Sequence, residues 1–148
     1  MARNGALFFG RLSEEKGIHT LLGAWSSLDI SLRIVGDGPL LDAVDDSPTA
    51  GIIGLGRKPP DEVAAEMKSA CFLIFPSEWY EGFPMTLVES FSHGLPVIAS
   101  RLGAMAEIVE DGVTGLHFTP GDPEDLAAKG RRAPRGDAAY GPGRAAGL

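Results

Sequence analysis

The sequence predicts a doubly wound α/β fold, in which helices cover both faces of a parallel sheet. Short apolar runs alternate with segments of helical periodicity along most of the chain, and that alternation is typical of parallel sheets with crossover helices. Both faces of each predicted strand are apolar, as expected when helices bury the sheet on either side. The 148 residues, with 44% hydrophobic and 22% charged content, suffice for one such domain with a full core.

Strands and helices are predicted in strict alternation. The strands are short apolar runs at 6–9, 31–35, 51–55, 71–75, 96–99 and 115–118. The helices are predicted at 14–28, 40–45, 60–70, 84–93, 104–109 and from Asp122 onward. Ser13 and Asp122 are the predicted N-caps of the first and last helices, and Pro84 is predicted at the first helical position of the fourth.

Residues 1–129 are predicted to form the domain, and residues 130–148 a flexible tail. From Thr119 onward the sequence is rich in Gly, Pro and Arg, and beyond Lys129 it has almost no large apolar residue. Such a segment has too little apolar surface to bury a helix face.

Composition disfavours several classes of protein. The net charge of −7 argues against a nucleic-acid binder, which normally presents a basic face. Cys71 is the single cysteine, and His19, His93 and His117 lack metal-ligand spacing, so neither a disulfide nor a metal site is predicted. No apolar run approaches the roughly 18 residues that span a membrane, and no secretory signal follows Met1, so the expected location is the cytoplasm.

Ligand binding is expected at the carboxyl ends of the predicted strands, as in other sheets of this class. Polar, basic or glycine-rich segments follow five of these strands, at 10–11, 36–38, 56–58, 77–78 and 100–101. These loops are expected to line one crevice together with the segment from Glu81 to Glu89.

Two cations follow the first predicted strand, Arg11 and Lys16. Two cations beside helix amides can hold a pyrophosphate; alternatively, both are solvated surface charges. A cation in the first turn of a helix opposes the helix dipole, so the predicted place of Lys16 is locally unfavourable. Such local violations often mark a functional site.

The turn Gly36-Asp37-Gly38 resembles the start of a dinucleotide-binding fingerprint, but Leu41 stands at the position of the third glycine. The sequence has no phosphate-binding P-loop motif either. We interpret this segment as a strand-to-helix turn close to the ligand crevice.

Glu81 and Glu89 lie on either side of the helix start predicted at Pro84. The free amides of that start lie between the two carboxylates, at the positive end of the helix dipole. This arrangement suits an anion flanked by two hydroxyl-bearing groups, which is the layout of a nucleoside diphosphate sugar. Two alternatives remain open at this point: the carboxylate pair of a retaining glycoside hydrolase, or two solvated surface charges.

An ordered series of motifs resembles the retaining nucleotide-sugar glycosyltransferases of the GT-B fold, in their large family 4 (glycosyl transferases group 1). The series is Gly10-Arg11-Leu12, Lys16-Gly17, 34–39, 76–77, 80–84, 89–90, 94–100, 107–109 and 111–116. Glu81 and Glu89 meet the family's Glu-x7-Glu pattern. The resemblance implies the carboxyl-terminal, donor-binding half of that fold, which is Rossmann-like.

The same resemblance implies a role for each site residue. Arg11 and Lys16 neutralise the diphosphate, so that neither a divalent metal nor another cofactor is needed. Glu81 binds hydroxyls of the transferred sugar, and Glu89 those of the ribose. The implied catalytic residues are Glu81, Arg11 and Lys16. The implied donor-binding residues are Gly10, Arg11, Lys16, Arg57, Lys58, Glu81, Gly82, Phe83, Pro84, Met85, Thr86, Leu87 and Glu89, with the base of a UDP-, GDP- or ADP-sugar near Arg57 and Lys58.

The predicted function is that of a hexosyltransferase-type glycosyltransferase that moves the sugar of an NDP-sugar to a sugar, lipid or other small-molecule acceptor with retention. An amino-terminal domain absent from this sequence is expected to bind the acceptor. Two other functions stay open: a non-catalytic or remnant nucleotide-sugar binding module, and a regulatory or dehydrogenase-like doubly wound domain.

Overall fold

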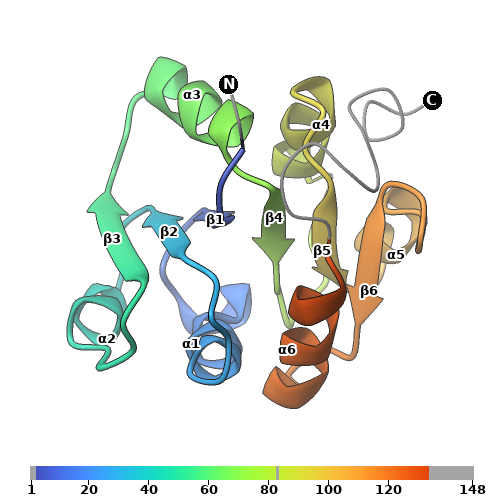
Figure 1. Ribbon diagram of the computed structural model, residues 1–148. Helices are drawn as coiled ribbons and strands as arrows, with labels where there is room; N and C mark the ends of the chain where they lie inside the picture. The colour runs from blue at the N-terminus through green and yellow to red at the C-terminus, as the bar shows by residue number, and fades with distance from the viewer. Residues whose placement is uncertain (1–2, 83, 134–148) are drawn as a thin grey trace.

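A parallel sheet of six strands forms the centre of the protein, in the order β3-β2-β1-β4-β5-β6 (Figure 1). The computed structural model describes residues 3–82 and 84–133, so most of the predicted tail, 134–148, lies outside the described residues. The strand order runs outward from β1 to β3 on one side and from β4 to β6 on the other. This is the doubly wound topology that the sequence predicts.

The described elements alternate along the chain. The strands are β1 Ala6–Phe9, β2 Leu32–Val35, β3 Ile52–Gly56, β4 Phe72–Phe75, β5 Val97–Ser100 and β6 Gly115–Phe118. The helices are η1 Glu14–Lys16, a short 3₁₀ turn, and α1 Ile18–Trp25, α2 Leu41–Asp45, α3 Pro60–Ser69, α4 Met85–Ser92, α5 Ala104–Ile108 and α6 Pro123–Arg132. The predicted strands therefore lie within one or two residues of the observed ones.

The sheet has a separate apolar core on each face. Alternate residues of β4 divide between them: Phe72 and Ile74 pack in the core under α1, α2 and α6, whereas Leu73 and Phe75 pack in the core under α3, α4 and α5. Side chains of a strand point alternately to the two faces, so an all-apolar strand fills both cores. The apolar runs of the sequence arise from this double burial.

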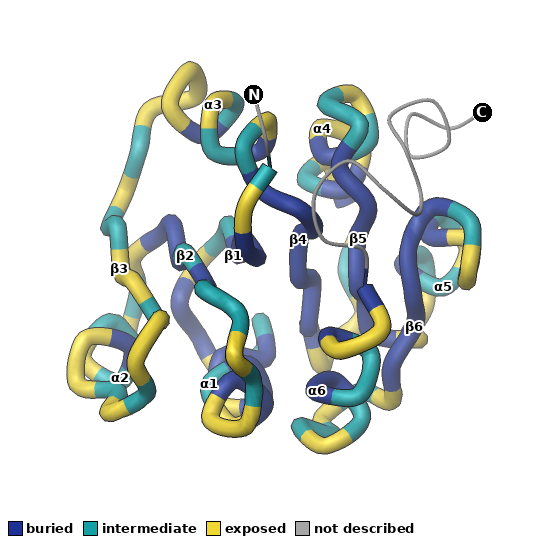
Figure 2. Tube along the Cα trace, viewed as in Figure 1, coloured by how far each residue is buried: buried dark blue, intermediate teal, exposed yellow. Residues whose placement is uncertain are grey.

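β3 departs from the prediction that every strand is apolar on both faces. Ile53 is 47% exposed and Gly54 is also exposed. Among the described strands β3 pairs with β2 alone, but β6 at the other edge of the sheet is buried at all four positions, so an edge position by itself does not produce this exposure. Figure 2 shows β3 partly yellow, whereas the central strands are dark blue. An edge strand has the same apolar composition as its neighbours here, so composition alone does not distinguish it.

One predicted helix is interrupted and another begins one residue later than predicted, although the start predicted at residue 14, after Ser13 as N-cap, agrees with η1. The continuous helix predicted from residue 14 to 28 is interrupted at Gly17, whose φ of +78° ends the 3₁₀ turn and begins α1. Lys16 is therefore the last residue of η1 and does not lie in the first turn of α1. Ser13 precedes η1 without a side-chain capping bond within the described turn. Pro84 is the N-cap of α4, which begins at Met85.

α6 extends the folded domain slightly beyond the predicted boundary at residue 129. The predicted N-cap is confirmed, because the carboxylate of Asp122 accepts a hydrogen bond from the amide of Asp125. The helix continues to Arg132, and Gly130 is buried against Leu28, where a Cβ would lie 3.0 Å from the Leu28 side chain. A glycine thus lets the last turn of α6 pack closely, and residues 130–133 belong to the domain.

Candidate functional site

The loops that follow β1, β2 and β3 line one open cavity at the carboxyl edge of the sheet. Its volume is about 550 Å³, and its lining residues are Phe9, Gly10, Arg11, Val35, Gly36, Asp37, Gly38, Arg57 and Lys58. Three of these side chains are basic and one, Asp37, is acidic. Three of the five loops predicted to line one crevice therefore meet here, as the parallel topology requires. Residues 77–78, 100–101 and the segment from Glu81 to Glu89, predicted to line the same crevice, are not among the lining residues of this cavity.

Glycines allow the loops after β1 and β2 to approach closely. A Cβ at Gly36 would lie 1.9 Å from the carbonyl oxygen of Gly10, and one at Gly38 would lie 2.6 Å from the carbonyl oxygen of Leu12. Backbone hydrogen bonds join the same segments, from the amide of Leu12 to the carbonyl of Asp37 at 3.0 Å. The interpretation of residues 36–38 as a turn beside the crevice is confirmed, and the turn itself forms part of the cavity wall.

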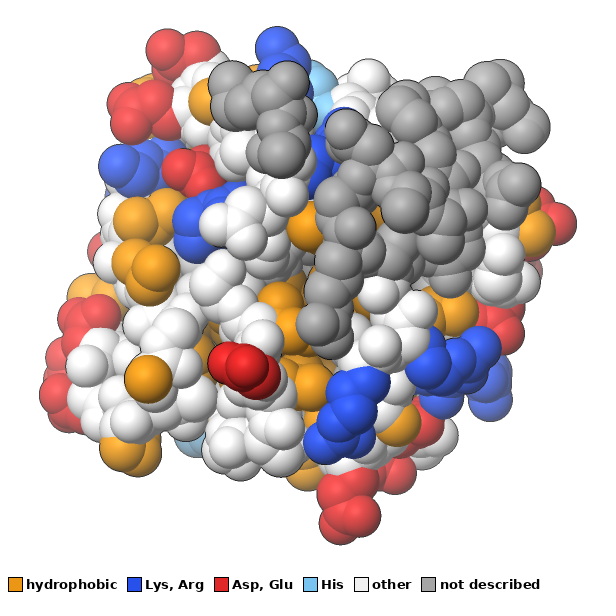
Figure 3. Space-filling view, in the orientation of Figure 1, with side chains coloured by type: hydrophobic (Ala, Val, Ile, Leu, Met, Phe, Trp, Pro, Cys, Tyr) orange, Lys and Arg blue, Asp and Glu red, His pale blue; other side chains and the backbone are white. Residues whose placement is uncertain are grey.

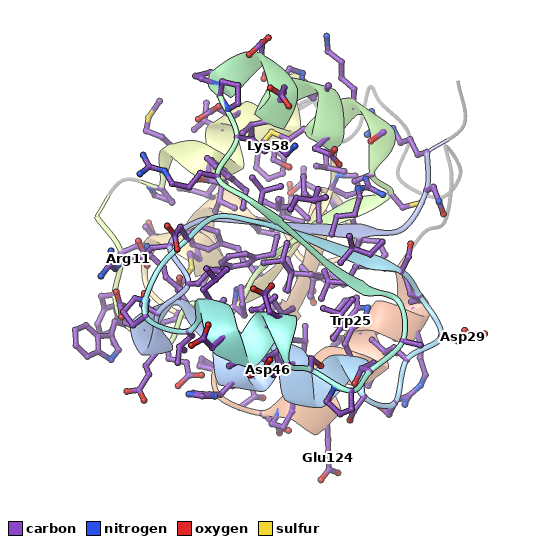
Figure 4. The ribbon with its side chains drawn as sticks, turned by 90° about the vertical axis from the view of Figure 1, so that its left-hand side faces the viewer. Arg11, Trp25, Asp29, Asp46, Lys58 and Glu124 are labelled. Atoms are coloured by element: carbon purple, nitrogen blue, oxygen red, sulfur yellow. The ribbon has the colours of Figure 1, made fainter. Side chains whose placement is uncertain are left out.

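The cations of the cavity come from two separate loops (Figure 4). Arg11 and Arg57 are exposed. Lys58 is partly buried, and its Nζ lies 3.5 Å from Oε1 of Glu62 in the first turn of α3. A register shift between β2 and β3 at Ile34 and Val35 turns the end of β3 and helps to set where Arg57 leaves the sheet. The side chains can therefore contact an anion without losing a buried partner.

Lys16 and Glu81 form an ion pair on the neighbouring loops. Nζ of Lys16 lies 2.9 Å from both Oε1 and Oε2 of Glu81. The side chains are only 26% and 17% exposed, respectively, so the pair is partly shielded from water. The two residues are 65 positions apart in the chain; both were predicted site residues, but their contact with each other was not predicted.

A second set of contacts fixes the loop that carries Glu81 against α1. The hydroxyl of buried Thr20 donates to Oε2 of Glu78 at 2.7 Å, and the amide of Glu78 donates to the carbonyl of Glu15 at 2.9 Å. A Cβ at Gly17 would lie 2.0 Å from the carbonyl oxygen of Pro76. The loop after β4 is thus held close to the residues on either side of Lys16.

These positioning residues were not identified from the sequence. Thr20 lies in a helical stretch and Glu78 in a loop, so neither has a local pattern that reveals the bond between them. Gly17 offered the one usable signal, because an isolated glycine within a helical pattern often has a structural reason.

The start of α4 carries the remaining predicted site residues. Met85 and Thr86 occupy its first two positions, whose amides have no acceptor within a helix. Leu87 is fully buried, and its amide donates to the carbonyl of Pro84 at 3.0 Å, so this residue belongs to the core under the site. Glu89 is exposed, on the same side of the helix as Met85 and Val88, which are 57% and 39% exposed.

Two exposed aromatic side chains border Glu81. Trp79 is 68% exposed and Tyr80 is 78% exposed. The ring of Tyr80 lies against Gly103, where a Cβ would be 2.7 Å from its Cδ1. The predicted donor-binding residue Phe83 lies outside the described residues, and Gly82 is exposed in the loop before it.

The segment around Arg11 and Lys16 is electrostatically favourable for an anion. The pKa of the Glu15 carboxyl is lowered, mainly by a hydrogen bond from its own backbone N–H, and the positive charges of Arg11 and Lys16 contribute to the lowering. Figure 3 shows acidic and basic side chains interspersed on the face in view. Three basic side chains and one acidic side chain line the cavity, so its lining is net basic although the net charge of the chain is −7.

The described part of the chain was also considered for metal-binding groups and for membrane-spanning helices. Within residues 3–82 and 84–133, no group of three or more His, Cys, Asp and Glu side chains is placed to hold a metal ion. In the same ranges, each helix is too short or too polar to cross a membrane.

Known proteins resemble this chain over nearly its whole described length. A family model described as "Glycosyl transferases group 1" matches residues 3–133. An uncharacterized glycosyltransferase of Methanocaldococcus jannaschii is 38% identical over 130 residues, which are 85% of this chain and 37% of that protein. A GDP-mannose-dependent alpha-mannosyltransferase of Corynebacterium glutamicum is 34% identical over 113 residues, 74% of this chain and 26% of that protein.

A solved structure shares the fold. It is an Anabaena protein in complex with UDP-glucose, with a TM-score of 0.73 and 27% identity, and the match covers 84% of this chain and 37% of that one. The chain thus spans well under half the length of these three proteins, as expected for one half of a GT-B fold. The chain belongs to the family of glycosyl transferases group 1.

Proposed function

We propose that this chain binds a nucleoside diphosphate sugar at the carboxyl edge of its sheet and forms the donor-binding part of a hexosyltransferase that retains the anomeric configuration. The observation that carries the proposal is the cavity lined by the basic side chains of Arg11, Arg57 and Lys58, in a chain of this family. The Lys16–Glu81 pair, which does not line that cavity, begins five residues along the chain from Arg11. The names of the Corynebacterium relative and the Anabaena neighbour, which specify GDP-mannose and UDP-glucose, support a nucleotide-linked hexose.

The proposed roles follow from charge and position. In the transfer, the bond between the anomeric carbon and the β-phosphate oxygen breaks, and an acceptor hydroxyl oxygen bonds to that carbon with the same configuration, while the hydroxyl proton passes to the departing diphosphate. The departing diphosphate carries negative charge, which Arg11 and Lys16 would stabilise together with the amides at the start of α4. This charge compensation would make a divalent metal unnecessary.

The other contacts concern the hydroxyls and the base. Glu81 would accept hydrogen bonds from hydroxyls of the sugar, and Glu89 from those of the ribose. Arg57 and Lys58, at the far side of the cavity, would contact a uracil, guanine or adenine base. We propose a sugar, lipid or other small molecule as acceptor, bound by a separate domain, and a cytoplasmic location where sugar nucleotides would be available.

Calorimetric titration of the unaltered chain with UDP, GDP and ADP tests the proposal. At least one of them is expected to bind with a dissociation constant below about 1 mM, or about −4 kcal/mol. If all three fail to bind at millimolar concentration, the chain does not have the proposed function.

Two variants test the assigned roles. Glu89→Ala is expected to weaken binding of the bare nucleotide roughly tenfold, because a hydrogen bond to a charged group contributes about 1.5 kcal/mol or more. Glu81→Ala is expected to reduce the preference among sugars while leaving the bare nucleotide bound. Equal loss of bare-nucleotide affinity in both variants would contradict these roles.

A further inference from the structure

Lys16 and Glu81 bind each other in the structure, although the proposed function assigns them to different parts of the donor. Both carboxylate oxygens of Glu81 accept from the single ammonium of Lys16, at 2.9 Å each. The diphosphate must therefore compete with Glu81 for Lys16, and the sugar hydroxyls must compete with Lys16 for Glu81.

We propose that this ion pair is exchanged when the donor binds, and that the exchange makes the site prefer the intact sugar nucleotide over the free nucleoside diphosphate. The inference rests on the proposed function and adds to it a discrimination between substrate and product at the same site.

The preference for the intact donor follows from which groups of the ligand replace Lys16 and Glu81 as partners of each other. A bare nucleoside diphosphate takes Lys16 and leaves the Glu81 carboxylate, which is only 17% exposed, beside a second anion and without its cation. Separating one partner from a shielded pair is costly because the remaining charge is poorly solvated. An intact donor also takes Lys16, but its sugar hydroxyls donate to Glu81 and offset that cost.

The surrounding contacts limit how far the loop that carries Glu81 can move away from Lys16. This loop is attached to α1 by the bond from Thr20 to Glu78 and to η1 by the bond from Glu78 to Glu15. The loop backbone at Pro76 lies directly against Gly17. Once the sugar has been transferred, Glu81 remains beside Lys16 and competes with the departing diphosphate, so product release is favoured.

Glu81→Gln tests the exchange, because glutamine keeps the size and loses the charge. Binding is measured by calorimetry for three matched ligand pairs, UDP and UDP-glucose, GDP and GDP-mannose, and ADP and ADP-glucose, and the tightest pair is used. The variant is expected to bind the bare nucleoside diphosphate about threefold more tightly, or about 0.7 kcal/mol. It is expected to bind the sugar nucleotide about threefold more weakly, so the preference for the intact donor falls roughly tenfold.

Glu14→Gln is the matched control for long-range charge. Glu14 lies in the same 3₁₀ turn as Lys16, its side chain is 83% exposed, and its Oε1 lies 3.8 Å from Nε2 of His19. This variant removes the same formal charge without altering the Lys16–Glu81 pair, so the affinities for both ligands are expected to change little and to the same extent. Lys16→Gln is expected to weaken binding of both the bare nucleotide and the sugar nucleotide.

The outcomes separate the two proposals. If the unaltered chain binds none of the six ligands, the proposed function fails and the exchange fails with it. If the unaltered chain binds them but Glu81→Gln leaves bare-nucleotide affinity unchanged or weaker, the exchange alone is wrong. The exchange is also wrong if Glu14→Gln tightens the bare nucleotide as much as Glu81→Gln does.

Discussion

Replacement of Gly17 by alanine is expected to disrupt the contact between the loop after β1 and the loop after β4. Gly17 has a φ of +78°, and a Cβ there would lie 2.0 Å from the carbonyl oxygen of Pro76. A positive φ costs an alanine roughly 1 kcal/mol, and relieving an overlap in a packed region adds about 1–3 kcal/mol. The free energy of unfolding should therefore fall by about 2–4 kcal/mol.

Gly112→Ala is the matched control for this prediction. Gly112 has a nearly identical φ of +81°, but a Cβ there would meet no atom of the described residues within 4 Å. It should lose only the cost of the positive φ, about 1 kcal/mol. Urea denaturation followed by circular dichroism measures both variants, and the Gly17 variant should lose about 1–2 M in midpoint. Equal midpoints for the two variants would refute the role of the Gly17–Pro76 contact.

Two further predictions concern positioning and pH. Thr20→Val removes the hydroxyl that donates to Glu78, so it should lower the free energy of unfolding by about 1 kcal/mol. Because the same loop carries Glu81, the variant should also weaken binding of a sugar nucleotide more than binding of the bare nucleotide. Thr20→Ser should restore both stability and binding, and failure of this rescue would count against the bond. The pKa of Asp125 is lowered, chiefly by the hydrogen bond from Lys129 and also by the one from the Thr119 amide. Its carboxylate therefore stabilises the fold fully above the ordinary pKa near 4. This stabilisation is lost as the pH falls through the lowered pKa. Asp125→Asn should therefore cost about 1 kcal/mol at neutral pH and much less once the pH has fallen below that lowered pKa. An equal cost at neutral pH and in strong acid would show that the charge is unimportant.

Periodicity and turn residues predicted the architecture because both reflect local physical constraints. Strands such as β4 Phe72–Phe75 are apolar throughout because both faces are covered. The predictions that were wrong concern features that depend on contacts between residues distant in the sequence. The helix is interrupted at Gly17, whose positive φ brings the backbone close to Pro76; the isolated glycine was a signal, but its distant contact was not visible in the sequence. The exposure of Ile53 was likewise not visible in the apolar composition of β3.

The candidate site was predictable to a similar degree. Parallel strands place their carboxyl ends at one edge, so the meeting of Arg11, Arg57 and Lys58 follows from the topology. The pairing of Lys16 with Glu81 does not follow, because it depends on how two loops 65 residues apart pack together. Glu89 lies on the exposed side of α4, so for this residue the alternative of a solvated surface charge stays open without a bound ligand.

The most direct test of the central claim is to locate the bound nucleotide by amide chemical-shift mapping on the isotopically labelled chain, with the tightest binder among UDP, GDP and ADP. The largest shifts are expected in the loops after β1, β2 and β3, at residues such as Gly10, Gly38 and Lys58, and at the start of α4. A second cavity, of about 470 Å³, is lined by residues around α5 and by His117, and its amides should stay unchanged. Shifts centred on that second cavity, or spread evenly over the surface, would contradict a donor site at the carboxyl edge of the sheet.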